Sequence, residues 1–214
     1  MNYLKVLNYE QIIFLKKYKS WLEKMPKHCI NTKSIFVHIP KSAGMSLVHS
    51  IYDLNTSNHD TWVEYYRRDK DKFFEYFKFA FVREPLDRFH SAYNYLSKNG
   101  KSEIDRYWNE KYIMPYKNIE DFILKGGLDI ASKKVEHFKP QTYYICKKNK
   151  IMVDFVGKYE SLNTDIEVIK NNLNLKFELA KVNENISSRI DYLSSNAKNK
   201  IHQIYEKDFL NFDY

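Results

Sequence analysis

The strongest constraint on the fold is a short stretch in which a strand-like pattern changes into a helix-like pattern. Residues 34–39 form an apolar, β-branched run that Pro40 ends, and apolar residues then recur at helical spacing from Leu47 to Leu54. A turn of this kind directs several backbone N–H groups and the positive end of a helix dipole at one point. We therefore expect a buried strand, a tight turn and a helix start that together bind a phosphate-like anion.

The turn itself contributes a cation and hydroxyl groups to the same point. The expected anion-binding loop consists of Pro40, Lys41, Ser42, Ala43, Gly44, Met45 and Ser46. A Walker-type nucleotide loop has its lysine directly after its second glycine, whereas Lys41 here precedes the single Gly44. The pattern therefore excludes a Walker loop. The simpler alternative is an ordinary strand-turn-helix unit with a solvent-exposed lysine.

The length of the chain, 214 residues, predicts a single domain, residues 1–214, with enough material for a hydrophobic core. Tyr18, Trp21, Leu22 and Met25 are spaced for one helix face, so we expect residues 1–33 to form a helical segment packed on this domain. Peripheral contact of this basic segment with a membrane is the alternative. No apolar run has the length of a membrane span or the pattern of a signal peptide, so we expect no transmembrane segment and a cytoplasmic protein.

The charge and the cysteines limit the possible partners. The formal net charge is +8, which suits an anionic partner such as nucleic acid, a membrane surface or a phosphorylated small molecule. The lysines are scattered and form no aromatic and basic surface, so we expect no nucleic-acid binding. Cys29 and Cys146 lie far apart with no metal-ligand spacing, which argues against a zinc site and a disulfide framework.

A second strand-turn-helix unit follows the first. The apolar run 76–82 ends at Arg83, Pro85 suits the first helical position, and apolar residues recur at helical spacing from Leu86. Ser91 falls two turns into this helix. Arg83 and Ser91 could grip one phosphate if the strand end curls over the helix.

Together the two units resemble those of sulfotransferases that use 3′-phosphoadenosine 5′-phosphosulfate (PAPS). The segment from His38 to Ser46 reads His-Ile-Pro-Lys-Ser-Ala-Gly-Met-Ser and is similar to the family's 5′-phosphosulfate loop, with Met45 in place of a hydroxyl residue. Phe81-Val-Arg-Glu-Pro85, followed by Arg88 and Ser91-Ala-Tyr93, resembles the family's 3′-phosphate element. The resemblance extends over about residues 34–214, and it is to the carbohydrate O-sulfotransferases, in a short form without a membrane anchor.

This resemblance implies a fold, a reaction and roles for residues. The implied fold is three-layer, P-loop-like α/β, with a short, mostly parallel sheet between helices and the donor at the carboxyl ends of the strands. The implied reaction moves the sulfuryl group of PAPS to a carbohydrate hydroxyl, leaves 3′-phosphoadenosine 5′-phosphate (PAP), and needs no metal. Lys41 would contact the bridging oxygen, residues 40–46 the 5′-phosphosulfate, and Arg83 and Ser91 the 3′-phosphate.

A histidine suits the role of the base that accepts the hydroxyl proton. His59 lies between the two phosphate elements, and His59-Asp-Thr61 matches a His-Xaa-Thr pattern in which related carbohydrate sulfotransferases carry a catalytic histidine. His137 is the rival, and a carboxylate base or no base is the remaining alternative. We expect His38, in the first strand, and His90, in the second helix, to be structural.

Two other classes of function are alternatives for such a chain. A small-molecule or nucleoside kinase also binds phosphates on such a sheet, but it would need a Walker loop and an acid that holds Mg²⁺, and neither is found. A basic nucleic-acid-binding module is the less favoured alternative.

The remaining segments give local expectations. Residues 113–128 predict one helix ending at a pair of glycines, and residues 147–150 a hairpin turn. Residues 151–160 predict a strand, and Thr164 a capping-box start for the helix that follows. Residues 181–183, Lys-Val-Asn, stand where the family often has His-Xaa-Asn.

Overall fold

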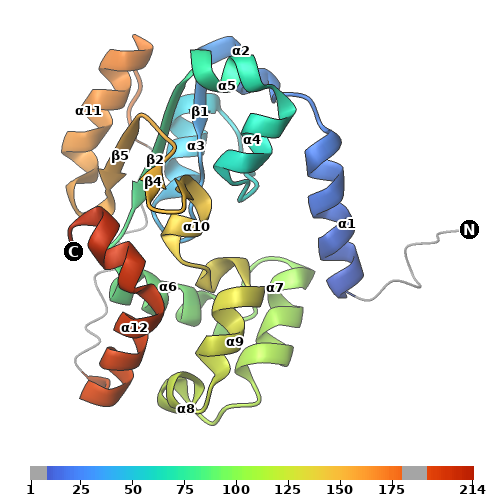
Figure 1. Cartoon of the computed structure of the whole chain (residues 1–214), viewed down its shortest axis with the longest axis vertical. Helices are drawn as coiled ribbons and strands as arrows, with labels where there is room; N and C mark the ends of the chain where they lie inside the picture. The colour runs from blue at the N-terminus through green and yellow to red at the C-terminus, as the bar shows by residue number, and fades with distance from the viewer. Residues whose placement is uncertain (1–8, 180–191) are drawn as a thin grey trace, which may run out of the picture.

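A computed structural model describes residues 9–179 and 192–214, and the polypeptide is drawn in Figure 1. The expectation for residues 181–183 lies outside the described residues.

The centre of the fold is a parallel sheet. In the described part of the chain it contains β1 (Ser34–Phe36), β2 (Phe77–Val82) and β5 (Phe155–Lys158), in the order β1-β2-β5. Both of its faces are buried, which suits the nearly continuous apolar sequence of β2. The carboxyl ends of all three strands meet at one edge of the sheet, because the strands are parallel.

Helices cover both faces of this sheet (Figure 1). Phe36, Phe79 and Phe81 pack on one side against α3 (Gly44–Tyr52) and α11 (Leu162–Leu173). Neighbouring strand residues such as Ile35 and Ala80 face the other way. On that side lie α2 (Lys27–Thr32), α4 (Trp62–Arg68), α5 (Lys70–Glu75) and α10 (Gln141–Ile145). The expected α/β fold, a short parallel sheet between helices, is confirmed.

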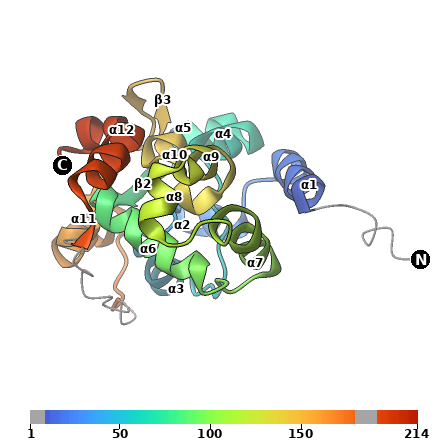
Figure 2. The ribbon, with the colours of Figure 1, turned by 90° about the horizontal axis from the view of Figure 1, so that it is seen from below.

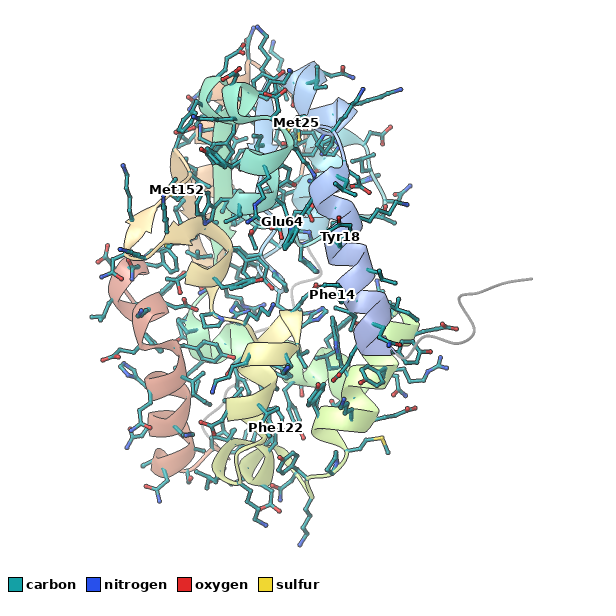
Figure 3. All side chains as sticks on the ribbon, turned by 45° about the vertical axis from the view of Figure 1, so that its right-hand side comes forward. Phe14, Tyr18, Met25, Glu64, Phe122 and Met152 are labelled. Carbon is teal, nitrogen blue, oxygen red and sulfur yellow. The ribbon has the colours of Figure 1, made fainter. Side chains whose placement is uncertain are left out.

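A second cluster of helices lies below the sheet in Figure 1 and buries its own aromatic core around Phe89, Phe122 and Phe138. Figure 3 labels Phe122 within this lower part of the molecule. The elements are α6 (Pro85–Ser97), α7 (Glu103–Trp108), a π-helical turn (Asn109–Ile113), α8 (Ile119–Leu124), α9 (Gly127–Lys134), a 3₁₀ turn (Glu136–Phe138) and α12 (Ser195–Phe212).

The N-terminal helix α1 (Tyr9–Leu22) runs along one side of the molecule, as Figure 2 shows from below. Trp21 donates a hydrogen bond to Glu64 of α4 at 3.3 Å, and Figure 3 labels Glu64 beside this helix. The helix face expected from Tyr18, Trp21, Leu22 and Met25 packs on the domain only in part. Met25 is buried but follows the helix, whereas Leu22 is 71% exposed. That residues 1–33 belong to a single domain stays a prediction.

Local predictions had mixed outcomes. The hairpin at residues 147–150 is confirmed, with β3 (Cys146–Lys147) antiparallel to β4 (Lys150–Ile151). The single helix over 113–128 is wrong, because α8 ends at Leu124 and Gly126, at φ 89°, precedes a separate helix. The strand over 151–160 is shorter, because Ile151 pairs in β4 of the hairpin and only residues 155–158 join the main sheet.

Two further boundaries differ from the sequence expectations. The capping box at Thr164 is wrong, because α11 already begins at Leu162 and Thr164 lies inside it. The first strand ends at Phe36, so His38 lies in the loop after the strand rather than within it. Pro85 does occupy the first position of α6, as predicted.

Candidate active site

The candidate site begins with the loop after β1. Lys41 and Ala43 both have positive φ angles, 70° and 62°, a conformation that residues other than glycine rarely adopt and that is often found at functional sites. Helix α3 then starts at Gly44, and its N-cap residue, Ala43, makes no side-chain capping hydrogen bond. The first N–H groups of α3 thus have no side-chain cap, which is the arrangement that suits an anion.

Lys41 is half-buried in this loop, in contrast to the alternative of a solvent-exposed lysine. Its Nζ atom lies 4.2 Å from the centre of the Tyr95 ring. Burial lowers the pKa of Lys41 to about 8, helped by Arg83 and Lys101 and opposed by Asp105. Lys41 is therefore a cation at neutral pH that loses its proton as the pH rises past about 8.

The other loop residues divide into buried and exposed ones. Ser42 is fully buried, and its hydroxyl donates to Oε1 of Gln141 at 3.5 Å. Met45, on the first turn of α3, is 44% exposed, and Ser46 is half-buried. The Ser42 hydroxyl thus faces Gln141 at the start of α10.

Arg83 follows β2 at the same edge of the sheet and is buried. Its Nη1 donates to the carbonyl oxygen of Lys41 at 3.3 Å, and its Nη2 pairs with Asp87 at 2.6 Å. The guanidinium carbon lies 4.2 Å from the centre of the Tyr159 ring, beyond β5. Ser91 lies on α6, half-buried. The structure thus brings the two expected phosphate elements into direct contact through Arg83 and Lys41.

Three histidine rings are brought together beside Lys41. The ring centres of His38 and His59 are 4.4 Å apart, and those of His59 and His137 are 5.6 Å apart. Burial lowers the pKa of all three imidazoles, most strongly for His38 and His137. The two candidate bases, His59 and His137, are therefore neighbours rather than residues on separate sides of the fold.

The hydrogen bond of His59 fixes its tautomer. Its Nδ1 lies 3.1 Å from the carbonyl oxygen of His38. A carbonyl oxygen can only accept, so Nδ1 carries the hydrogen and Nε2 keeps a lone pair in the neutral ring. An imidazole in this state is a proton acceptor at Nε2.

The residues after His59 hold it in place. Thr61 caps α4 in a capping box with Glu64, whose Oε2 accepts from the Thr61 backbone N–H at 2.7 Å and also from its hydroxyl. Asp60 pairs with Arg68 at 2.8 Å, and the side chain of Arg68 is 1% exposed. The threonine of the His-Xaa-Thr pattern therefore has a structural role here, since it caps α4 and ends the loop that carries His59.

His137 is buried and held by its backbone. Arg88, fully buried, donates from Nη1 to the His137 carbonyl oxygen at 3.2 Å. The Nδ1 atom of His137 makes no hydrogen bond to the described residues, and its nearest carboxylate is Asp105 at 4.0 Å. His90 lies apart from this cluster on α6, where its ring contacts that of Tyr192 at 6.0 Å.

Three residues of the site were not singled out from the sequence as site residues. Gln141 accepts from the Arg83 backbone N–H and donates to the Arg83 carbonyl, both at 2.9 Å. The pair Pro140-Gln141, which resembles a Pro-Gln segment of the sulfotransferases, is the sequence signal for it. Tyr95 and Asp105, which are described below, had no such signal, since Ser102 and Asp105 have the spacing of an ordinary helix cap.

In the ranges 9–179 and 192–214, no group of three or more His, Cys, Asp or Glu side chains has an arrangement that could hold a metal ion. None of the helices described combines the length and the apolar composition needed to cross a bilayer.

The fold and the site define a class of protein: an α/β protein with an uncapped helix start, a half-buried lysine and a neutral histidine at the carboxyl edge of a parallel sheet. The sequence profile of the sulfotransferase family matches residues 27–214. The chain therefore belongs to the sulfotransferase family.

The curated relatives that this chain resembles are carbohydrate sulfotransferases. The chain is 35% identical to human carbohydrate sulfotransferase 14 over 101 residues, which are 42% of this chain and 27% of the relative. It is 27% identical to rat carbohydrate sulfotransferase 11 over 166 residues, 65% of this chain and 47% of the relative. The matches thus span between about a quarter and a half of these relatives. No solved structure matches the chain significantly.

Proposed function

We propose that this protein is a sulfotransferase that moves the sulfuryl group of PAPS to a hydroxyl of a carbohydrate or glycoconjugate. The family and the printed names of the relatives support this reaction and this acceptor class. The single observation that carries the proposal is the proximity of two elements: the lysine loop after β1, and a histidine, His59, whose Nδ1 is bonded to the carbonyl of His38 in that same segment. An anion site and a base are thereby parts of one structural unit.

The residues present fit the donor. The N–H groups at the start of α3 and the ammonium of Lys41 suit the 5′-phosphosulfate, and Arg83 and Ser91 would hold the 3′-phosphate. When bound, the donor supplies an activated sulfuryl group. Catalysis then depends mainly on positioning and on the stabilisation of developing charge, as in phosphoryl transfer.

Each site residue has one task in this proposal. Lys41, as the protonated amine, stabilises negative charge on the leaving oxygen. His59 accepts the acceptor's hydroxyl proton at Nε2, because its Nδ1 hydrogen is already committed to His38. His137 remains the rival base, since its ring is also in the cluster. The cytoplasmic location stays a prediction from the sequence.

Binding measurements test the donor, and product analysis tests the reaction. Thermal unfolding should be shifted upward by PAP but not by ATP with Mg²⁺ or by single-stranded DNA, because a ligand at a hundredfold its dissociation constant adds about 2.7 kcal/mol. Mass spectrometry should then find an added sulfate on a member of a carbohydrate panel incubated with PAPS. Stabilisation by ATP or DNA alone would contradict the proposal and favour the kinase or nucleic-acid alternative.

A further inference from the structure

Asp105 is a buried carboxylate beside the candidate site to which neither the motifs nor the proposed chemistry gives a role. It lies in the first turn of α7, and 5% of it is exposed. Its Oδ2 accepts hydrogen bonds from the Tyr95 hydroxyl at 2.9 Å and from the backbone N–H groups of Lys101 and Ser102 at 3.1 and 3.0 Å. Its Oδ1 lies 4.0 Å from Nδ1 of His137. Asp105 is therefore fixed, with one oxygen directed at the histidine cluster.

The ring of Tyr95 connects Asp105 with two groups of the site. Lys41 Nζ lies 4.2 Å from the centre of this ring, and the ring of His137 stacks on it with centres 5.1 Å apart. Burial, together with the hydrogen bond to Asp105, raises the pKa of Tyr95 to about 12, so the hydroxyl remains a donor to the carboxylate. The position of Asp105 thus helps to set the positions of Lys41 and His137.

The charge of Asp105 also favours the protonated form of Lys41. Arg83 and Lys101 are the cations that disfavour the charged form of Lys41, and Asp105 is the group that favours it. Charges in a partly buried site interact more strongly than the same charges in water. Loss of the negative charge at Asp105 would therefore make Lys41 easier to deprotonate.

The same charge acts on His59. A proton that His59 accepts adds a positive charge to the histidine cluster, and the negative charge of Asp105 favours that charged form. The charged form of His59 is favoured by Glu136, the carbonyl of His38, Asp105 and Asp60. The charged form of His137 is disfavoured by His59, Lys41 and Arg88.

We infer that Asp105 is a positioning residue for sulfuryl transfer, which holds Tyr95 against Lys41 and His137 and provides the counter-charge for the proton taken up by His59. In the step itself the acceptor oxygen bonds to sulfur, and the bond from sulfur to the donor's bridging oxygen breaks. The bonding electron pair stays on that oxygen, beside Lys41. The hydroxyl proton goes to His59 Nε2 and is later released to water. This inference rests on the proposed function.

The decisive variant is Asp105→Asn, which keeps the acceptor oxygen and the size of the side chain but removes the charge. The rate should have a bell-shaped dependence on pH, with neutral His59 setting the acid limb and protonated Lys41 the basic limb. Both limbs should move to lower pH in the variant, because the carboxylate no longer favours either charged form. The maximal kcat should fall by about 10–100-fold, the loss typical when a carboxylate that orients a metal-bound histidine is removed.

Two control variants separate charge from structure. Ser102→Ala removes the other half of the α7 cap, the acceptor for the Asp105 backbone N–H, without touching the Tyr95 hydroxyl. It should lower the melting temperature and leave the pH limbs where they are. Tyr95→Phe keeps the ring and the carboxylate, so it should not shift the limbs to lower pH. A shift of both limbs in either control would show a packing effect and would overturn the inference.

A measurement without substrate distinguishes this inference from the proposed function. Nuclear magnetic resonance titration of the histidine rings should give a lower pKa for His59 in Asp105→Asn than in the wild type. Absence of sulfate transfer by the wild type would remove the proposed function and the inference that rests on it, and a lower His59 pKa would then describe only electrostatics. Wild-type transfer with an unchanged pH profile and unchanged histidine titration in the variant would overturn the inference alone.

Discussion

Gly44 lies so close to the ring of His38 that a Cβ atom at this position would be 1.8 Å from Nε2 of that ring. The glycine at the start of α3 is therefore required by the packing of His38, whose carbonyl oxygen accepts from His59. The same contact joins the start of α3 to the cluster of three histidines.

We predict that Gly44→Ala destabilises the protein through this contact. The added methyl group must displace the His38 ring, and overpacking of this kind costs about 1–3 kcal/mol. Urea unfolding of the variant measures the loss. Gly126→Ala is the control. An alanine at its φ of 89° is strained by the backbone, but the added Cβ meets open space, so no clash contributes to the loss of stability.

Combining each glycine variant with His38→Ala tests whether the clash with the His38 ring causes the loss of stability. The effects of Gly44→Ala and His38→Ala should be less than additive, because removal of the ring removes the clash, whereas those of Gly126→Ala and His38→Ala should add. Additive effects in both pairs would contradict the role of the contact.

Lys41→Ala should remove most of the turnover. A cation on a leaving oxygen in a site shielded from water is worth about 3–4 kcal/mol, or two to three orders of magnitude in kcat. Steady-state kinetics with PAPS measures the loss, and Lys98→Ala, which changes an exposed lysine at the end of α6, is the control. The wild-type rate should also decline as the pH rises past about 8, because Lys41 then loses its proton. A variant with half the wild-type rate would refute the role.

Arg83→Ala should weaken PAP binding more than it slows saturated turnover, because the 3′-phosphate is remote from the reacting sulfur. Calorimetry with nucleotides that carry or lack the 3′-phosphate measures the difference. Asp87→Ala is the matched control, since Asp87 pairs with Arg83 and its removal leaves the guanidinium charge in place. Equal affinity of the wild type for both nucleotides would end the proposal for Arg83.

His59→Ala should lower turnover by about 10²–10⁴-fold and leave nucleotide affinity nearly unchanged, because a general base contributes to the transition state and not to donor binding. The kinetics of His137→Ala, measured in parallel, identify the base. An inactive His137→Ala together with an active His59→Ala would reverse the assignment.

Stability should fall as the pH drops below about 6.5, the ordinary pKa of histidine. The folded-state pKa values of His38, His59 and His137 are lowered by burial, so the unfolded chain binds these protons at a higher pH than the folded chain. Stability rises with pH wherever the unfolded state binds more protons, and it is lost as the pH falls. Melting temperatures between pH 7.5 and 5.5 test this, and the decline should be shallower in His137→Gln. An equal slope in that variant would contradict the prediction.

The sequence by itself determined the two strand-turn-helix units, the parallel α/β fold and the family, because hydrophobic periodicity and the loop residues around Lys41 and Arg83 are local in the chain. The hairpin at residues 147–150 and the N-terminal proline of α6 were predictable for the same reason. Boundaries such as the start of α11 were not, since the local cap pattern at Thr164 was overridden by the turn before Leu162.

Only the tertiary structure decided how the site is assembled. His38, His59 and His137 come from three separate segments, and their contact depends on the packing of those segments around the sheet edge. Asp105 shows this most clearly: within its own helix it is an ordinary cap residue. Its place beside Tyr95 exists only because α6 and α7 pack together, and the periodicity of a sequence carries no information about which side chains from distant segments will meet.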